Sequence, residues 1–136
     1  MIFERAELQR QTDLAIGYEA GEGCEHLAHS AYKSLDDSWE DDAKVEAESF
    51  DKVVATGPVV FRRTFENWES NIFEDSPTVA DVLRAMRDSM KDLNDYHHIF
   101  FEGYKVNPVR GVSSACGHCG RGAGERVTFI DIHTGS

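Results

Sequence analysis

Residues 76–94 read SPTVADVLRAMRDSMKDLN and predict an amphipathic helix. Apolar side chains recur three and four positions apart, which places them on one face of a helix. They are Val79, Val82, Leu83, Met86, Met90 and Leu93. Ser76 is the expected N-cap, Pro77 the first helical residue and Asn94 the end of the helix. A helix with one apolar face has to cover another element, so the flanking segments decide the fold class.

Both flanking segments and the last part of the chain are β-rich. Residues 59–65 (VVFRRTF), 96–106 (YHHIFFEGYKV) and 127–133 (VTFIDIH) favour strands through their β-branched and aromatic side chains. The order is strand, helix, strand, loop, strand, and the last two strands are expected to pair as a hairpin across loop 110–124. We predict an α+β fold, in which N-terminal helices precede a small antiparallel or mixed sheet of three or four strands. The 76–94 helix and some of the N-terminal helices cover one face of that sheet.

The first part of the chain predicts three helices. Residues 3–18 and 24–35 form the first two, with glycines between them. Ser38 is the expected cap of the third, and Gly57-Pro58 ends it. Its apolar residues at helical spacing are Trp39, Ala43, Ala47, Phe50, Val53 and Val54.

The chain length predicts one domain, residues 1–136, with an uneven charge. Fourteen basic against 25 acidic side chains leave a net charge of −11. Most of the excess lies in residues 1–56, the acidic helical half; residues 57–136, the sheet half, are nearly neutral. Such a field repels nucleic-acid backbones and anionic membrane surfaces, so direct nucleic-acid or membrane binding is not expected. It favours a partner protein with a basic surface.

The sequence pattern also predicts a compartment. The N-terminus lacks the basic start and apolar run of a secretory signal, and no apolar run approaches the roughly 18 residues of a membrane span. The three cysteines are an odd number and argue against a disulfide scaffold. We expect the protein in the cytoplasm, or in a virion if it is viral.

The sharpest local motif is Cys116-Gly117-His118-Cys119, inside a Gly-rich loop. This CGHC tetrapeptide resembles the active-site motif of protein disulfide isomerases, and that resemblance implies thiol–disulfide exchange. The same run is similar to one copy of the Cys-x-x-Cys-x-Gly-x-Gly element of the DnaJ zinc domain, and that resemblance implies zinc binding. Here the glycines, Gly120, Gly122 and Gly124, stand one residue out of that register.

Two cysteines at this spacing supply half of a tetrahedral zinc site. Cys24 and His29 are the expected further ligands, so Cys116, Cys119, Cys24 and His29 would form a structural zinc site that joins the two halves. The alternatives are a redox dithiol and reduced thiols with no special chemistry.

His97 and His98 are adjacent on a predicted strand and therefore face opposite sides of it.

An acidic run lies in the predicted third helix. Helical spacing brings Asp37, Asp41 and Glu48 near one outer line, with Glu40 and Asp42 beside it. We predict that these five residues bind a basic partner, because complementary charge accelerates encounter. The alternatives are an ordinary solvated face and mimicry of a nucleic acid.

No catalytic constellation stands out: the chain has no matched nucleophile and base, and no Walker or dinucleotide motif. The sequence therefore favours a non-enzymatic protein-interaction or assembly module. Such a module would be an accessory, regulatory or structural subunit of a larger complex, homo- or hetero-oligomeric, including a viral or phage particle. The alternatives are a zinc- or thiol-dependent enzyme that uses Cys116 and Cys119, and an acidic nucleic-acid-mimic inhibitor.

Overall fold

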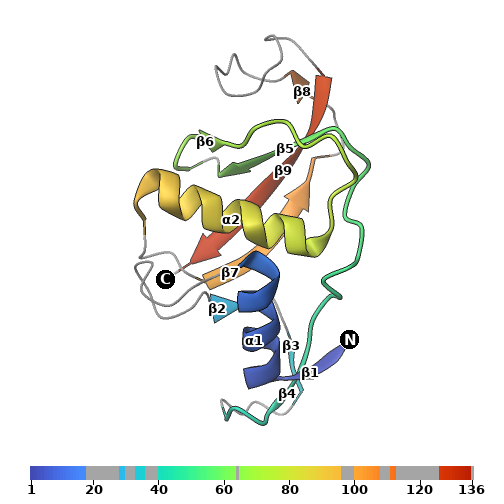
Figure 1. Cartoon of the computed structure of the whole chain (residues 1–136), viewed down its shortest axis with the longest axis vertical. Coiled ribbons are helices and arrows are strands. Elements are labelled where there is room, and N and C mark those ends of the chain that lie inside the picture. The colour runs from blue at the N-terminus through green and yellow to red at the C-terminus, as the bar shows by residue number, and fades with distance from the viewer. Residues whose placement is uncertain are drawn as a thin grey trace.

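A computed structural model shows an α+β domain (Figure 1). It describes residues 1–17, 28–29, 33–35, 40–63, 65–95, 100–107, 111–112 and 126–135. The helices are α1 (Arg5–Ile16) and α2 (Val79–Leu93). The strands are β1 (Ile2–Glu4), β2 (Ala28–His29), β3 (Lys33–Ser34), β4 (Lys44–Glu46), β5 (Val59–Arg63), β6 (Trp68–Glu69), β7 (Phe100–Val106), β8 (Gly111–Val112) and β9 (Arg126–Gly135). The predicted fold class is confirmed.

The main sheet has the strand order β2-β7-β9-β5-β6, with β8 also pairing with β9. Strands β7 and β9 are antiparallel, with Tyr104 opposite Ile132, as the expected pairing of the last two strands requires. Strand β5 runs parallel to β9, with Phe61 opposite Ile130. The sheet is therefore mixed, which is one of the two arrangements that the sequence predicted.

Helix α2 covers one face of this sheet and forms the core with it (Figure 1). Val82, Leu83 and Met86 are buried against β5 and β9 residues such as Phe61 and Ile130. Replacing one of these large aliphatic side chains by alanine would cost about 2–5 kcal/mol. The apolar face predicted for residues 76–94 is the face that the fold buries.

The start of α2 differs from the prediction. Thr78, not Ser76, is the N-cap, and its backbone N–H donates to Asp81 Oδ2 at 2.8 Å in a capping box. This reciprocal arrangement satisfies N–H groups at the helix start that Ser76 would leave open. Pro77 therefore precedes the cap and is not the first helical residue. Asn94 adopts the left-handed conformation, with φ of 51°, and ends the helix as predicted.

The second and third predicted helices are wrong in the residues that the structure describes. Within 24–35, the described segments 28–29 and 33–34 are strands β2 and β3. Residues 40–56 hold strand β4 and turns. Ala43 and Ala47 were interpreted as members of a helical face, but Val45 between them is also buried, while Lys44 and Glu46 are exposed. Alternate burial is the period of a strand.

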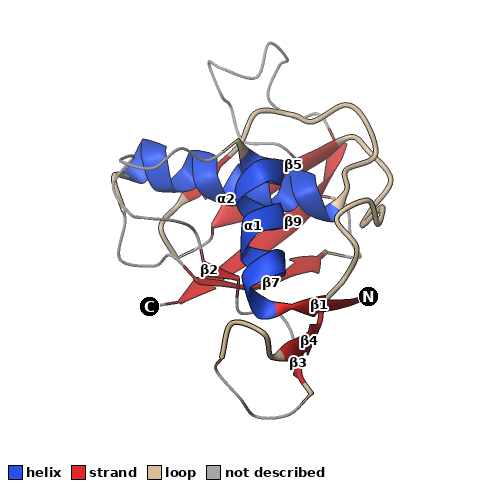
Figure 2. Cartoon of the chain, turned by 60° about the horizontal axis from the view of Figure 1, so that its bottom comes forward, coloured by secondary structure: helices blue, strands red, loops and turns tan. Residues whose placement is uncertain are grey.

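Strand β4 is central in a smaller sheet of order β1-β4-β3. Helix α1, predicted as residues 3–18, follows β1 directly and packs Leu8 against Phe3 and Val45. No side chain caps α1; the carbonyl oxygens of Ala43 and Asp41 accept from its first two N–H groups instead. Figure 2 shows α1 crossing α2 on the side away from the main sheet.

One arginine is fully buried where β5, α2 and β9 meet. Arg63 is 1% exposed, and its Nη1 donates to Ser89 Oγ at 3.2 Å. Its Nη2 lies 3.1 Å from Glu66 Oε1, 3.1 Å from Asp95 Oδ2 and 3.2 Å from Thr134 Oγ1. The two carboxylates offset the cost of burying its charge, which would otherwise be several kcal/mol.

Candidate functional site

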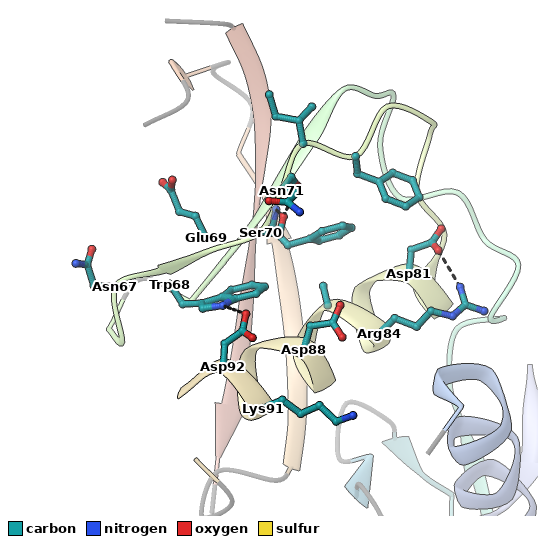
Figure 3. A pocket seen from close by; sticks show the side chains of 14 residues that line it. Asn67, Trp68, Glu69, Ser70, Asn71, Asp81, Arg84, Asp88, Lys91 and Asp92 are labelled. Carbon is teal, nitrogen blue, oxygen red and sulfur yellow. Dashed lines mark hydrogen bonds and ion pairs between the residues drawn. The ribbon is translucent and has the colours of Figure 1, made fainter. Parts of the chain in front are cut away.

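An open groove of about 990 Å³ lies between α2 and the segment 67–73 (Figure 3). Its walls are adjacent in space because Trp68 of the edge strand β6 packs in the same core cluster as α2. It is lined by Phe61, Asn67, Trp68, Glu69, Ser70, Asn71, Ile72, Phe73, Asp81, Arg84, Ala85, Asp88, Lys91 and Asp92. We call this feature the α2–β6 groove.

Backbone pairing holds the strand side of the groove in place. Trp68 pairs with Arg63 in an antiparallel register, and Ser70 N–H donates to Phe61 O at 2.9 Å. Phe73 then exchanges both backbone hydrogen bonds with Val59. This register places one extra residue between Ser70 and Phe73, which is a β-bulge. The bulge bends the segment 67–73 and shapes that side of the groove.

The floor of the groove is aromatic. Phe61 and Trp68 belong to the buried core, and Phe73 packs edge-to-face on Phe61 with ring centroids 5.9 Å apart. Trp68 Nε1 donates to Asp92 Oδ2 at 3.0 Å, which ties the floor to the α2 wall (Figure 3).

The α2 wall is charged. Arg84 is held by Asp81, with Nη1 to Oδ1 at 2.8 Å, and its Nε donates to Ala15 O at 2.7 Å. Asp88 has no hydrogen bond or ion pair to another residue that the structure describes, although it lies one turn from Asp92. In Figure 3 Asp88 projects from α2 between Asp92 and Arg84.

The pKa of Asp88 is raised above its ordinary value of 3.8. Partial burial is the main cause, and the neighbouring Asp92 carboxylate adds to it; Arg87 and Lys91 act in the opposite direction. Both main causes disfavour the anionic form. A cation placed beside Asp88 would therefore stabilise the anionic form of its carboxylate, which burial and Asp92 disfavour.

The chemistry of the groove follows from these contents. Its lining holds four carboxylates, Glu69, Asp81, Asp88 and Asp92, against two basic side chains. It offers anionic acceptors over an apolar, aromatic floor. Such a surface suits a ligand that is cationic at one end and apolar along its length.

Three of the four predicted zinc ligands lie outside the described residues. Cys24, Cys116 and Cys119 lie outside the described residues, as do His97 and His98. His29 lies in β2, opposite Phe101 of β7. Among the residues that the structure describes, no group of three or more His, Cys, Asp or Glu side chains is arranged around a metal position. The zinc site stays a prediction.

The structure only partly groups the predicted partner-binding acids. Glu40, Asp41 and Asp42 are exposed in one turn before β4, and Asp37 lies outside the described residues. Glu48 accepts from Lys52 Nζ at 2.9 Å and from the Tyr104 hydroxyl at 2.7 Å.

The outer helical line assumed for these acids is wrong, because residues 40–56 are not helical. Burial and the Glu48 carboxylate together raise the pKa of Tyr104. Glu48 therefore serves a contact within the fold, and the exposed turn residues Glu40, Asp41 and Asp42 remain the predicted partner-binding acids.

Comparisons with protein-family models, with curated proteins and with solved structures find no match for this chain. Within the described part of the chain, no helix combines the length and the apolar character needed to cross a membrane. The groove and its chemistry are thus the basis for a functional proposal.

The sequence interpretation missed the groove. Trp68, Ile72 and Phe73 lie between the predicted strand 59–65 and the predicted helix 76–94, and three large apolar residues there indicate a buried side. Asp88 and Asp92, four residues apart on the polar face of α2, were the second signal. Only the tertiary structure brings these two sets together.

Proposed function

We propose that the protein is a non-enzymatic interaction module, an accessory or assembly subunit, that binds a basic segment of another protein in the α2–β6 groove. The observation that carries this proposal is Asp88. Its carboxylate is partly desolvated, lies next to Asp92 and makes no hydrogen bond or ion pair with another described residue.

Electrostatics favours this kind of partner. Bringing a positive charge to Asp88 offsets its repulsion from Asp92, so the attraction is larger than for a fully solvated carboxylate. The net charge of −11 adds long-range steering of a basic partner toward the surface. An anionic ligand would be repelled both by the Asp88 and Asp92 carboxylates and by the net negative charge of the chain.

The aromatic floor supplies the second component of binding. Apolar side chains of the partner would pack on the partly exposed Ile72 and Phe73 while its basic side chains reach the α2 wall. Burial of apolar surface contributes about 25 cal/mol per Å² before the costs of association are subtracted. A segment with alternating basic and apolar residues matches both parts of the groove.

A labelled short peptide that alternates lysine and valine tests the proposal by fluorescence anisotropy. We expect it to bind, to dissociate as salt is raised, and to bind about tenfold more weakly to the double variant Asp88→Asn, Asp92→Asn. A matched peptide with glutamate in place of lysine should not bind.

The control variant is Asp41→Asn, Asp42→Asn, which removes the same charge from the turn before β4. Binding unchanged in this control and weakened in the groove variant supports the proposal. Loss of binding in the control alone would move the interface to the turn, and failure of the lysine peptide to bind would overturn the proposed function.

A further inference from the structure

We infer that Phe65, in the turn between the antiparallel strands β5 and β6, is an apolar contact residue for the segment that binds in the α2–β6 groove. This inference rests on the proposed function and specifies one part of its interface. The bound segment continues past the end of the groove and packs an apolar side chain on the Phe65 ring.

Phe65 is the most exposed large apolar residue in the described part of the chain. It is 96% exposed, and the next of these residues, Leu14, is 67% exposed. The fold therefore gains almost nothing from an aromatic side chain at this position. Burial of the ring by a partner would remove its apolar surface from water, which favours binding.

The turn that carries Phe65 is held in place by its neighbours. Glu66 Oε1 lies 3.1 Å from Nη2 of the buried Arg63. Asn67 adopts the left-handed conformation, with φ of 54°, and the indole of Trp68 is hydrogen-bonded to α2. The exposed ring thus stands on a preorganised turn, so a partner that packs on it orders little besides the side chain itself.

Phe65 also lies close to the groove. It stands two positions before Asn67, which lines the end of the groove opposite to Arg84 (Figure 3). Two residues of chain span at most about 7 Å. A segment that lies in the groove and continues past Asn67 therefore comes within reach of the Phe65 ring.

The charge of the chain favours this partner over the other surfaces that cover exposed aromatic rings. The groove beside Phe65 is lined by four carboxylates and two basic side chains, so it attracts a segment with basic residues. A second copy of the chain carries the same net charge of −11, and an anionic membrane surface is also negative. Both are repelled, whereas a basic segment with apolar residues is not.

The experiment measures the binding of two labelled peptides to the full chain by fluorescence anisotropy. One alternates lysine and valine and the other lysine and serine, and both are long enough to pass the end of the groove. We expect Phe65→Ala to weaken binding of the lysine–valine peptide about tenfold and to leave the lysine–serine peptide unchanged. Phe65→Leu, which keeps an apolar side chain, should retain most of the affinity.

Two controls accompany these variants. Ile2→Ala removes another large apolar side chain, 63% exposed in β1 of the smaller sheet, and should leave both affinities unchanged. Urea unfolding of Phe65→Ala should give the midpoint of the parent chain, because the ring is almost fully exposed in the fold.

The outcomes separate this inference from the proposed function. Unchanged binding of the lysine–valine peptide by Phe65→Ala would overturn the inference and leave the proposed function in place. An equal loss for the two peptides, or an equal loss in Ile2→Ala, would also overturn it, because the effect would then not come from apolar contact at Phe65. Absence of binding by both peptides would overturn the proposed function and this inference with it.

Discussion

Trp68 and Asp92 join the edge strand β6 to the last turn of α2 through one hydrogen bond, Nε1 to Oδ2 at 3.0 Å. The bond holds the floor and the charged wall of the groove in a fixed relation. Because Trp68 is only 9% exposed, water could not readily replace this acceptor, and the indole N–H would be left without a partner if the acceptor were absent.

Trp68→Phe should lower the free energy of unfolding by about 1–3 kcal/mol, because it removes the hydrogen bond and leaves a small cavity. Urea unfolding followed by far-UV circular dichroism measures this loss. Asp92→Asn is the control, since its amide oxygen still accepts from the indole, and it should cost less than about 1 kcal/mol. Equal losses in the two variants would show that the bond itself contributes little.

Asp88→Asn should raise stability near neutral pH. The folded-state pKa of Asp88 is raised, so the free energy of unfolding falls as pH rises through that pKa and the carboxylate ionises. The carboxylate is only partly buried, so the gain from removing the charge should stay below about 1 kcal/mol. The difference between variant and parent should vanish at pH values well below 3.8, where Asp88 is protonated in both folded and unfolded chains. A constant difference across this pH range would contradict the proposed cause.

Local patterns were sufficient for four elements of the sheet half but did not predict β6, or β8 within the predicted loop 110–124. The apolar face of α2 and the β-rich segments became α2, β5, β7 and β9, because in each of them the residue period matches the side that is buried. The spacing of apolar residues predicted the wrong element between residues 40 and 56, because Ala43 and Ala47, four positions apart, lie on one face of either a helix or a strand. Pairing of β4 with β1 and β3 decided between them, and that is a long-range contact.

The site was less accessible to sequence reasoning than the fold. The acidic run 36–51 has a high charge density, but in the described residues its helical alignment does not exist, and Glu48 is engaged by Tyr104. Asp88 and Asp92 are ordinary polar-face residues until the fold brings the segment 67–73 opposite them, with Trp68 bonded to Asp92. Their significance depends on desolvation and proximity, which no local pattern reports.

The predicted zinc site leads to a measurement that needs no partner. Native mass spectrometry of the purified chain should show one bound zinc, and a chelator should remove it with a loss of folded structure. Cys119→Ser should lose the metal and unfold at lower denaturant concentration. Serine at position 114, outside the proposed ligands, allows Ser114→Ala as the control, which should keep both the metal and the stability. A metal-free folded chain would refute the site made of Cys24, His29, Cys116 and Cys119.

Arg63 offers the most direct test of what holds the sheet half together. Arg63→Met fills most of the volume but removes the charge that Glu66 and Asp95 share. Those carboxylates are partly exposed and regain some hydration, so we expect a loss of about 2–4 kcal/mol, somewhat less than for a fully buried pair. Urea unfolding measures it.

Arg63→Lys separates charge from geometry. Lysine restores the positive charge, but its single ammonium group cannot reach Ser89 and both carboxylates at once, as the forked guanidinium does. We therefore expect it to recover only about half of the stability that Arg63→Met loses. Full recovery would mean that charge alone matters here. A well-packed apolar side chain can replace a buried ion pair without cost. If Arg63→Met is as stable as the parent, packing and not the ion pairs fixes the contact between β5, α2 and β9.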